Sequence, residues 1–548
     1  MAFADLFPTA RRAFGYIKRH GITGIGGIIL APPLLLAAYP VLFLYAKNWS
    51  YLSVYDLVSP LAWSVALSLA LMSAVNLIVR DGHKTSIIVS LFLVVFFSYG
   101  HIYELAKTAG GRAVPHGVLL AVIFSIYAVC VVVIYSVARA REYFTRFIGA
   151  FTLILSVFVS VELVSAIASD VEEYMTELKN PPINITRQAG RNGGIGIHPD
   201  IYYIILDSYS SEKALKDYFG FDNSPFTMWL KKEGFVMPPK TWSNYCQTAL
   251  SIPSSLNMDY IGKLMDISGK KESPDRSPLK RLMAMNAVST FLKERGYTIV
   301  KFIFGYSITD AFAADYTDRP EGLLFLHEFT NHIANTTMLI CFQDFIEGEG
   351  KVSVNARRVM AEVEGLPVAA VKFKSPKFVF AHILCPHPPF VFDENGPITK
   401  YIDWDMPDAG TPGFDAKKSD YKNGYLGQVK FINRHIKKAI ARIISDSKTP
   451  PVIILQADHG SGMSYYFDLA KSNPADRFSI LNAYYLPYGG KAVIYDSITP
   501  VNSFREVLNY YFGANLEILP DRNFFTSGDR PYKMTEITER LKEEAAKK

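Results

Sequence analysis

The chain has 548 residues, which is too long for one ordinary domain and indicates two or three. Hydrophobic residues make up 49% and charged residues 20%, but the apolar stretches are concentrated in residues 22–168, and the rest reads as an ordinary water-soluble protein. The net charge of +6, without a stripe of Lys and Arg interleaved with aromatic side chains, excludes nucleic acid as the expected partner.

Five apolar stretches near the N-terminus are each long enough to cross a bilayer about 30 Å thick as a helix. They cover approximately residues 22–46, 57–79, 84–106, 116–138 and 147–168. The first is too long to be the apolar part of a cleaved signal peptide, and others follow it closely. The sequence therefore predicts an all-α transmembrane domain of five helices in residues 1–179.

The Lys and Arg residues of the short connections predict the orientation of these helices. The alternate connections contain only Lys47, Lys107 and Arg112. The N-terminal arm and the other two connections contain Arg11, Arg12, Lys18, Arg19, Arg80, Lys84, Arg139, Arg141 and Arg146. We therefore expect a cytoplasmic N-terminus. Because the number of predicted spans is odd, the chain after residue 168 is then expected outside the cytoplasm.

Residues 180–198 are rich in proline, glycine and polar side chains, which is typical of a linker. Short apolar, β-rich stretches and helical patterns alternate beyond it. The clearest of them cover residues 201–206, 377–382 and 451–457 for strands, and 279–295 and 421–446 for helices. This alternation predicts an α/β domain with a mostly parallel central sheet in residues 199–530. Residues 531–548 form a charged C-terminal tail, whose end we expect to be a solvated helix.

The chain has four cysteines and no CxxC pair of the kind found in zinc ribbons or thioredoxin-like sites. Cys130 lies in an apolar stretch, so three cysteines remain for the soluble part. One disulfide is compatible with this content, for example Cys341–Cys385, although spacing alone does not establish it.

Acidic and histidine side chains follow the predicted strands. Asp207 comes directly after the first strand, His387 follows the second, and Asp458 and His459 follow the third. Because the carboxyl ends of parallel strands meet at one edge of a sheet, these side chains can converge on one site. Two carboxylates and an imidazole can bind a divalent cation. Each residue also has a plain structural explanation, since Asp207 can cap a helix and the Asp458-His459 pair can belong to a turn.

A hydroxyl-rich segment, which includes Thr248 and Ser251, opens a helical pattern. Backbone N–H groups at a helix N-terminus favour an anion, and a neighbouring metal ion would lower the pKa of a hydroxyl and make it a nucleophile. The alternative is an ordinary capping segment in which the two hydroxyls satisfy backbone N–H groups.

The order of these candidate residues, from Asp207 to His459, resembles the alkaline phosphatase/sulfatase superfamily over approximately residues 199–520. Within it, the chain looks most like the membrane-bound phosphoethanolamine transferases and the lipoteichoic acid synthases, which are phosphoglycerol transferases. The nucleophile segment of the phosphoethanolamine transferases runs Thr-Ala-x-Ser-Val-Pro, and residues 248–253 read Thr-Ala-Leu-Ser-Ile-Pro. Both groups also resemble this chain in having a five-helix anchor before the catalytic domain.

The resemblance implies a nucleophile and a metal site. Thr248 would be the nucleophile and, together with Asp207, Asp458 and His459, a metal ligand. The relatives usually have Glu where Asp207 stands, which is one departure from their pattern. A sulfatase alignment would use Ser251 as the reactive residue, but the arginine of that motif is missing here. We therefore expect Thr248 to be the nucleophile.

The resemblance also implies residues that bind the substrate. The segment Cys-Pro-His-Pro-Pro resembles the one that supplies a histidine to the substrate phosphate, which assigns that role to His387. His382 is the alternative. Arg477 and Asn482 would shape the substrate pocket, unless they only support the strand that follows the metal site.

The function implied in this way is transfer of a phospholipid headgroup, phosphoethanolamine or phosphoglycerol, to a glycan or lipid A-like acceptor through a phosphothreonine intermediate. One divalent metal ion would be needed, and we expect zinc rather than manganese or magnesium. The implied location is a bacterial inner membrane with a periplasmic or extracellular catalytic domain. The alternatives are a sulfatase-like or phosphodiesterase hydrolase of an extracytoplasmic ester, and a catalytically inactive membrane sensor or scaffold.

Overall fold

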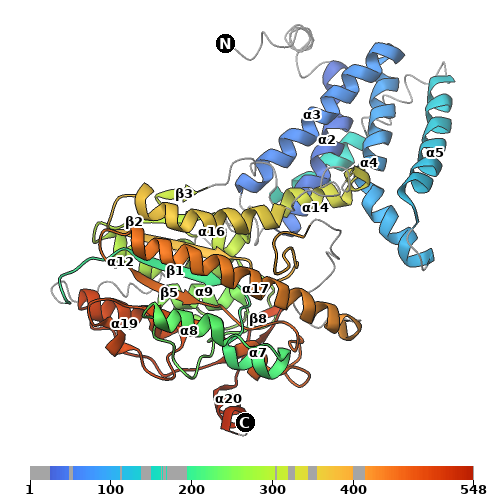
Figure 1. The fold of residues 1–548 in the computed structure, drawn as a ribbon. Helices are drawn as coiled ribbons and strands as arrows, with labels where there is room; N and C mark the ends of the chain where they lie inside the picture. Colours follow the sequence, from blue (N-terminus) through green and yellow to red (C-terminus); the bar gives the residue numbers. More distant parts are fainter. Residues whose placement is uncertain are drawn as a thin grey trace. The chain divides into compact units, whose positions relative to one another are not determined.

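The chain divides into two compact units (Figure 1). We call Met1–Thr176 with Phe325–Gly348 the helical unit, and Glu177–Leu324 with Glu349–Lys548 the sheet unit. The predicted linker lies outside the described residues up to residue 193. The computed structural model describes residues 25–48, 54–110, 114–136, 150–161, 163–164, 168, 194–302, 305–318, 328–342, 354–398 and 414–546.

Four helices of the helical unit are long and apolar enough to cross a membrane. They are α2 (Ile25–Lys47), α3 (Val54–Val79), α4 (Gly82–Gly110) and α5 (His116–Ser136). α5 buries none of its residues within the protein although it is apolar on all sides, which is typical of a helix that faces lipid. The fifth predicted span is described only in part, as a shorter apolar helix at Ala150–Val161. Four of the five predicted helices are therefore confirmed as apolar helices long enough to span a membrane, and the fifth stays a prediction.

A segment from the second half of the sequence also belongs to the helical unit. It forms α14 (Glu328–Thr336) and the 3-10 helix η3 (Met338–Phe342), and both pack on α4. The packing is close because α4 has a glycine at this place. A Cβ atom at Gly100 would lie 2.2 Å from the backbone oxygen of Asn335. The predicted catalytic domain at 199–530 is thus interrupted by a stretch that folds with the membrane helices.

Cys341 in η3 contacts a histidine at the start of α5. Its Sγ lies 3.7 Å from Nδ1 of His116, and the hydroxyl of Tyr99 lies 3.0 Å from the same nitrogen. All four cysteines are free thiols. The disulfide considered for Cys341 and Cys385 is therefore not formed.

The sheet unit is built around a sheet of six strands in the order β3-β2-β4-β1-β5-β6. All neighbouring strands are parallel except β5 and β6. β1 lies in the middle and is buried along its whole length, as its uninterrupted apolar sequence predicts. The three predicted strands and the mostly parallel sheet are confirmed. The strands are β1 (Ile201–Leu206), β2 (Thr298–Phe302), β3 (Tyr316–Asp318), β4 (Lys377–Ile383), β5 (Val452–Gln456) and β6 (Asn482–Tyr485).

Helices cover both faces of this sheet (Figure 1). On one face α16 (Val354–Lys372) packs against α17 (Phe414–Asp446), and on the other α9 (Thr248–Asn257) packs against α19 (Pro500–Phe512). The other helices are α7 (Glu212–Phe219), α8 (Ser224–Lys232), α10 (Ile261–Leu264), α11 (Ser277–Ala284), α12 (Ala287–Lys293), α13 (Ser307–Asp310), α18 (Pro474–Phe478) and η4 (Gly490–Val493).

The single helix predicted for residues 279–295 is in fact two helices, α11 and α12. Asn286 separates them because its side-chain oxygen accepts a hydrogen bond of 2.9 Å from the backbone N–H of Ser289. Such a capping bond satisfies one of the free N–H groups at the start of a helix, so a new helix begins there.

The C-terminal region differs from the expected charged tail. Residues 524–536 form a hairpin of β7 (Phe524–Ser527) and β8 (Arg530–Glu536), and α20 (Thr538–Ala546) follows. Leu541 of α20 is buried in a cluster that also contains Cys246 and Phe525. The tail is thus solvated on one side only, and the structured domain extends beyond residue 530.

Candidate metal and nucleophile site

Three neighbouring strands, β4, β1 and β5, bring the predicted residues together at their carboxyl ends. Asp207 directly follows β1. His382 lies on β4, paired with Ile205 of β1. Asp458 and His459 follow β5, which pairs with the other side of β1. The parallel register therefore places these side chains at one edge of the sheet.

Asp207, His382 and Asp458 form a compact, buried cluster in which potential ligand atoms all lie within 4.8 Å of one another. Nε2 of His382 is 3.2 Å from Oδ2 of Asp207. Nδ1 of the same ring is 3.0 Å from the hydroxyl of Thr309, which donates its own proton to the carbonyl of Tyr306. The ring thus donates to Thr309 through Nδ1. Its Nε2 faces Asp207 either with the second proton of an imidazolium or with a lone pair directed toward a cation.

His459 lies next to this cluster. Its Nδ1 lies 2.9 Å from the carbonyl oxygen of Gly460, which can only accept, so Nδ1 carries a proton. Its Nε2 lies 3.3 Å from Oδ2 of Asp458 and 3.7 Å from Oδ1 of Asp207. The backbone N–H of Ser208 donates to the other oxygen of Asp458 at 3.1 Å. The backbone thereby fixes one oxygen of the Asp458 carboxylate, and the other oxygen faces the imidazole of His459.

Two buried oxygens of the cluster, Oδ1 of Asp207 and Oδ2 of Asp458, have no hydrogen-bond partner among the described residues. Leaving a charged oxygen unpartnered away from water is costly. Burial raises the pKa of the Asp207 carboxyl, but the charges of His387, His382 and His459 and the hydrogen bond with His382 outweigh burial, and the pKa is about 2. The carboxylate therefore stays ionised at neutral pH. These buried oxygen and nitrogen donors fit a divalent ion such as zinc or manganese.

Thr248 is the first residue of α9, and its Oγ1 lies 3.2 Å from Nε2 of His459. The hydroxyl therefore adjoins the carboxylate cluster and lies at a helix N-terminus, where an anionic oxygen is stabilised. Ser251, the alternative of the sulfatase alignment, is engaged elsewhere. Its hydroxyl donates to the carbonyl of Tyr245 at 3.1 Å. Of the two hydroxyls, only that of Thr248 contacts a residue of the cluster.

The loop before Thr248 is held by the C-terminal hairpin. The side-chain amide of Gln247 donates to the carbonyl of Ser527 at 2.9 Å, and Asn244 donates to the carbonyl of Arg522 at 2.9 Å. The sequence did not indicate this role for Arg522 and Ser527, which lie inside the domain predicted for residues 199–530. Gln247 and Ser527 are 280 residues apart, and no local pattern links the two segments.

Two residues predicted to bind the substrate, His387 and Arg477, both lie near His459 but differ in their burial and contacts. His387 is half-buried, and its ring centroid lies 6.4 Å from that of His459. Arg477 is buried, donates to the carbonyls of Cys246 and Gly460 at 2.9 and 3.2 Å, and has its Nη2 3.3 Å from Nε2 of His459. It thus joins the loop before Thr248 to the turn that contains His459.

Asn482 lies on β6, and its side-chain contacts are with neighbouring elements of the fold. Its Nδ2 donates to the carbonyl of Ile498 at 3.3 Å, and its Oδ1 accepts from Gln456 at 2.9 Å. These bonds support the sheet, which was the alternative reading of this residue. Thr309 was not predicted at all, since its contact with His382 spans 73 residues. The only feature of the sequence that could have indicated Ser208 as part of the site is its position directly after Asp207.

No family model matches the chain, and no curated protein sequence matches it. Among solved structures, the C-terminal periplasmic domain of phosphoethanolamine transferase EptC from Campylobacter jejuni is similar with a TM-score of 0.38 and 11% identity, over 60% of this chain and 94% of that one. The lipooligosaccharide phosphoethanolamine transferase A from Neisseria meningitidis, an integral membrane protein, is similar with a TM-score of 0.35 and 12% identity, over 92% of this chain and 94% of that one. The phosphonate monoester hydrolase of Agrobacterium radiobacter is similar with a TM-score of 0.38 and 13% identity, over 60% of this chain and 80% of that one. The solved structures similar to this chain thus include two phosphoethanolamine transferases and a phosphonate monoester hydrolase.

Proposed function

We propose that this protein is a metal-dependent enzyme that transfers a phospholipid headgroup to a cell-envelope glycan or lipid acceptor through a phosphothreonine at Thr248. The observation that carries the proposal is the contact of 3.2 Å between Oγ1 of Thr248 and Nε2 of His459, beside two buried carboxylates. A hydroxyl becomes a nucleophile only where a neighbouring group stabilises its deprotonated form. The four apolar helices favour a donor that is itself a membrane lipid.

One divalent ion would be held by Asp207, Asp458, His459 and the oxygen of Thr248. His382, which forms a compact cluster with the two aspartates, is a further candidate ligand. When bound, the ion would lower the pKa of the threonine hydroxyl and neutralise charge on the phosphoryl oxygens. The unpartnered oxygens of the two aspartates support this assignment.

In the proposed first step, the oxygen of Thr248 forms a bond to phosphorus while the bond from phosphorus to the diacylglycerol oxygen breaks. The threonine loses its proton, and diacylglycerol leaves with one. The imidazole of His387 is near enough to His459 to bind a phosphoryl oxygen of the same substrate. Arg477 keeps the segments of Thr248 and His459 together through its bonds to two carbonyls. In the second step, an acceptor hydroxyl displaces Thr248, so the kinetics are ping-pong.

Release of labelled diacylglycerol tests this proposal. Detergent-purified full-length protein is incubated with fluorescent phosphatidylglycerol or phosphatidylethanolamine and with zinc or manganese. We expect metal-dependent release that is lost in Thr248→Ala. Ser251→Ala is the matched control, because its hydroxyl is bound to a backbone carbonyl and should not react. Release from neither lipid by metal-loaded protein would contradict headgroup transfer, and release of free headgroup phosphate with acceptor present would identify a hydrolase.

The proposal includes a location in a bacterial inner membrane, with a cytoplasmic N-terminus and the sheet unit outside the cytoplasm. The distribution of Lys and Arg along the predicted connections supports it. A reporter enzyme that is active only outside the cytoplasm, fused at the C-terminus, should be active. A reporter that functions only inside the cell and is active at this position would contradict the orientation.

A further inference from the structure

One surface of the sheet unit, which we call the basic face, combines the solvent-facing side of α17 with the exposed side of α8. Residues 430–442 of α17 include five Lys and Arg residues and no Asp or Glu. At about 100° per residue, these cations fall within about 140° of the helix circumference, so they share one side of the helix. The basic face consists of Lys430, Arg434, Lys437, Lys438 and Arg442 on α17, and of Met228, Lys231 and Lys232 on α8.

Two of the α17 cations have carboxylate partners. Nζ of Lys430 lies 2.7 Å from Oε2 of Glu394. Nε of Arg442 lies 3.8 Å from Oδ2 of Asp446, one turn further along the helix. Both pairs are open to solvent, where such contacts are weak. An anionic partner can therefore compete for both cations.

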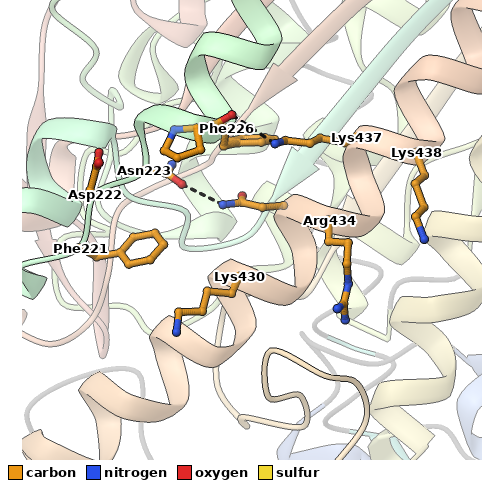
Figure 2. Close-up of a pocket in the computed structure, with 10 residues that line it drawn as sticks. Phe221, Asp222, Asn223, Phe226, Lys430, Arg434, Lys437 and Lys438 are labelled. Atoms are coloured by element: carbon orange, nitrogen blue, oxygen red, sulfur yellow. Dashed lines mark hydrogen bonds between the residues drawn. The ribbon is translucent and has the colours of Figure 1, made fainter.

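Arg434 and Lys438 are exposed, and neither forms a hydrogen bond or ion pair with another residue that the structure describes. Figure 2 shows that both project away from Phe221 and Phe226. Burial lowers the pKa of His435, which is half-buried on the same helix, and the charges of Arg434 and Lys438 lower it further. This side of α17 thus disfavours additional positive charge and attracts anions.

The exposed side of α8 places an apolar side chain among cations. Met228 is 59% exposed. Lys231 and Lys232 follow it at the helical spacings of three and four residues, so they lie on the same side of α8. Both lysines are exposed, and their ammonium groups have no hydrogen-bond or ion-pair partner in the described part of the chain.

Lys437 joins the two helices into one surface. Its Nζ donates to the carbonyl of Pro225 in α8 at 3.2 Å and lies 5.7 Å from the ring centroid of Trp229. It also lies 5.7 Å from the ring centroid of Phe226, which is only 2% exposed (Figure 2). The ring of Phe226 is therefore closed to a small ligand. What the basic face offers a partner is its charges and the exposed side chain of Met228.

Cations around an exposed apolar side chain are typical of protein surfaces that lie on anionic membranes. Lysine and arginine bind lipid phosphates, while methionine can enter the boundary between headgroups and acyl chains. A soluble polyanion would use the charges but leave Met228 in water. The same chain has four helices long and apolar enough to cross a membrane. The proposed membrane location therefore tethers the basic face near a bilayer, where weak individual contacts are sufficient for binding.

We propose that the basic face docks on anionic phospholipids of the membrane that holds the chain. Arg434, Lys438 and the two lysines of α8 contact lipid phosphates, and Met228 lies among the headgroups. The inference depends on the proposed membrane location but not on headgroup transfer, because the basic face shares no residue with the metal and nucleophile site. Headgroup transfer is tested separately, by diacylglycerol release.

Acetylation of individual lysines tests this proposal. Full-length Thr248→Ala protein, which cannot consume lipid through the proposed nucleophile, is placed in nanodiscs of phosphatidylcholine with or without phosphatidylglycerol. Peptide mass spectrometry then gives the acetylation rate of each lysine. We expect Lys231, Lys232 and Lys438 to react at least about threefold more slowly in the discs with phosphatidylglycerol, and high salt to remove the difference.

Lys263 is the internal control for accessibility. It is exposed on α10, which packs on α9, and α9 covers the face of the sheet opposite to α17. Its acetylation rate should be the same in both kinds of disc. Equal rates for the lysines of the basic face in both kinds of disc, or an equal slowing of Lys263, would overturn the proposal.

Removal of charge from α17 tests whether its cations hold α8 at the lipid. Arg434→Gln/Lys438→Gln should abolish the slowing of Lys231 by phosphatidylglycerol, although Lys231 lies on the other helix. The matched control is Lys270→Gln/Lys271→Gln, which removes the same charge from the segment between α10 and α11, both of which pack on α9. Loss of the slowing in both double variants, or in neither, would contradict docking through the basic face. Slowing by the soluble polyanion heparin in phosphatidylcholine discs, as strong as that by phosphatidylglycerol, would assign the face to a soluble polymer instead.

Discussion

Nε2 of His459 lies within 4 Å of three side-chain oxygens: Oγ1 of Thr248 at 3.2 Å, Oδ2 of Asp458 at 3.3 Å and Oδ1 of Asp207 at 3.7 Å. Because Nδ1 of the ring donates to the carbonyl of Gly460, the ring cannot turn without losing that bond. The orientation of the imidazole toward Thr248 is therefore fixed by the backbone of the next residue, as is common for histidines that bind metals.

A covalent adduct should accumulate on Thr248 when the donor lipid is supplied without an acceptor. Intact-protein and peptide mass spectrometry would show a headgroup phosphate on the peptide that contains this residue. Thr248→Ala should form no adduct and lose more than about 1,000-fold in rate, because the whole covalent route is removed. Thr248→Ser should retain part of the activity. An adduct on Ser251 would assign the nucleophile to the sulfatase-like alignment.

Metal affinity should depend on Asp207 and Asp458, each of which has one oxygen without a hydrogen-bond partner among the described residues. Asp207→Asn or Asp458→Asn removes a charged oxygen from a buried cluster, so we expect zinc or manganese affinity to fall by at least about 100-fold. Isothermal titration of chelator-treated protein measures it. Metal should also raise the unfolding temperature of the wild type, since a ligand at 100 times its Kd adds about 2.7 kcal/mol. Asp420→Asn, an exposed change on α17, is the control, and an equal loss of affinity in this variant would contradict the site.

Asp476 should make the protein less stable as pH rises from about 4 to 6. Its carboxylate is buried with both oxygens 3.0 Å from the hydroxyl of Ser461, and burial raises its pKa from 3.8 to about 6. The folded state therefore binds the proton more tightly than the unfolded state, and stability present below pH 4 is lost as pH rises through 6. The shift corresponds to at most about 3 kcal/mol.

Asp476→Asn should reduce this slope, to which the buried Glu362 also contributes because burial raises its pKa, and thermal unfolding followed by near-UV circular dichroism between pH 4 and 7 would show the reduction. Asp207, with its pKa of about 2, contributes only below pH 4 and in the opposite direction. The exposed Asp468→Asn is the control and should keep the wild-type slope. Parallel curves for the wild type and Asp476→Asn would contradict the assignment.

Gly100→Val should release the segment of α14 and η3 from α4, because the added Cβ would lie 2.2 Å from the carbonyl oxygen of Asn335. Amide hydrogen exchange in the full-length protein should then rise in residues 328–342. Gly117→Val is a matched control in α5, where an added Cβ meets no atom within 4 Å. Equal exchange in all three proteins would show that the close packing at Gly100 does not hold this segment.

The site residues that could be predicted are those next to strands. Asp207, Asp458 and His459 directly follow apolar stretches whose strand character is a local property of the sequence, and parallel pairing then brings them together. The prediction that Thr248 is the nucleophile depended on the resemblance of residues 248–253 to a known motif, since a hydroxyl at the start of a helix is equally typical of a cap.

Contacts between distant segments could not be predicted. Thr309 binds His382, and Arg477 binds the carbonyl of Cys246. The sequence around these side chains has no periodic pattern of apolar residues that would indicate either contact. Residues from 531 on were expected in a charged tail, but Ile537 and Leu541 pack with Phe525 and with Cys246 of the loop before Thr248. Such packing depends on the assembled core and not on local propensity.

The return of residues 328–342 to the apolar helices affects how a water-soluble form of this protein can be produced. A protein that starts near residue 198 would still contain α14 and η3, but it would lack α4, on which they pack. Phe329 and Met338, which are buried in the full chain, would then be exposed to water and would promote aggregation. Truncation at the linker should therefore be combined with replacement of residues 325–348 by a short polar connection.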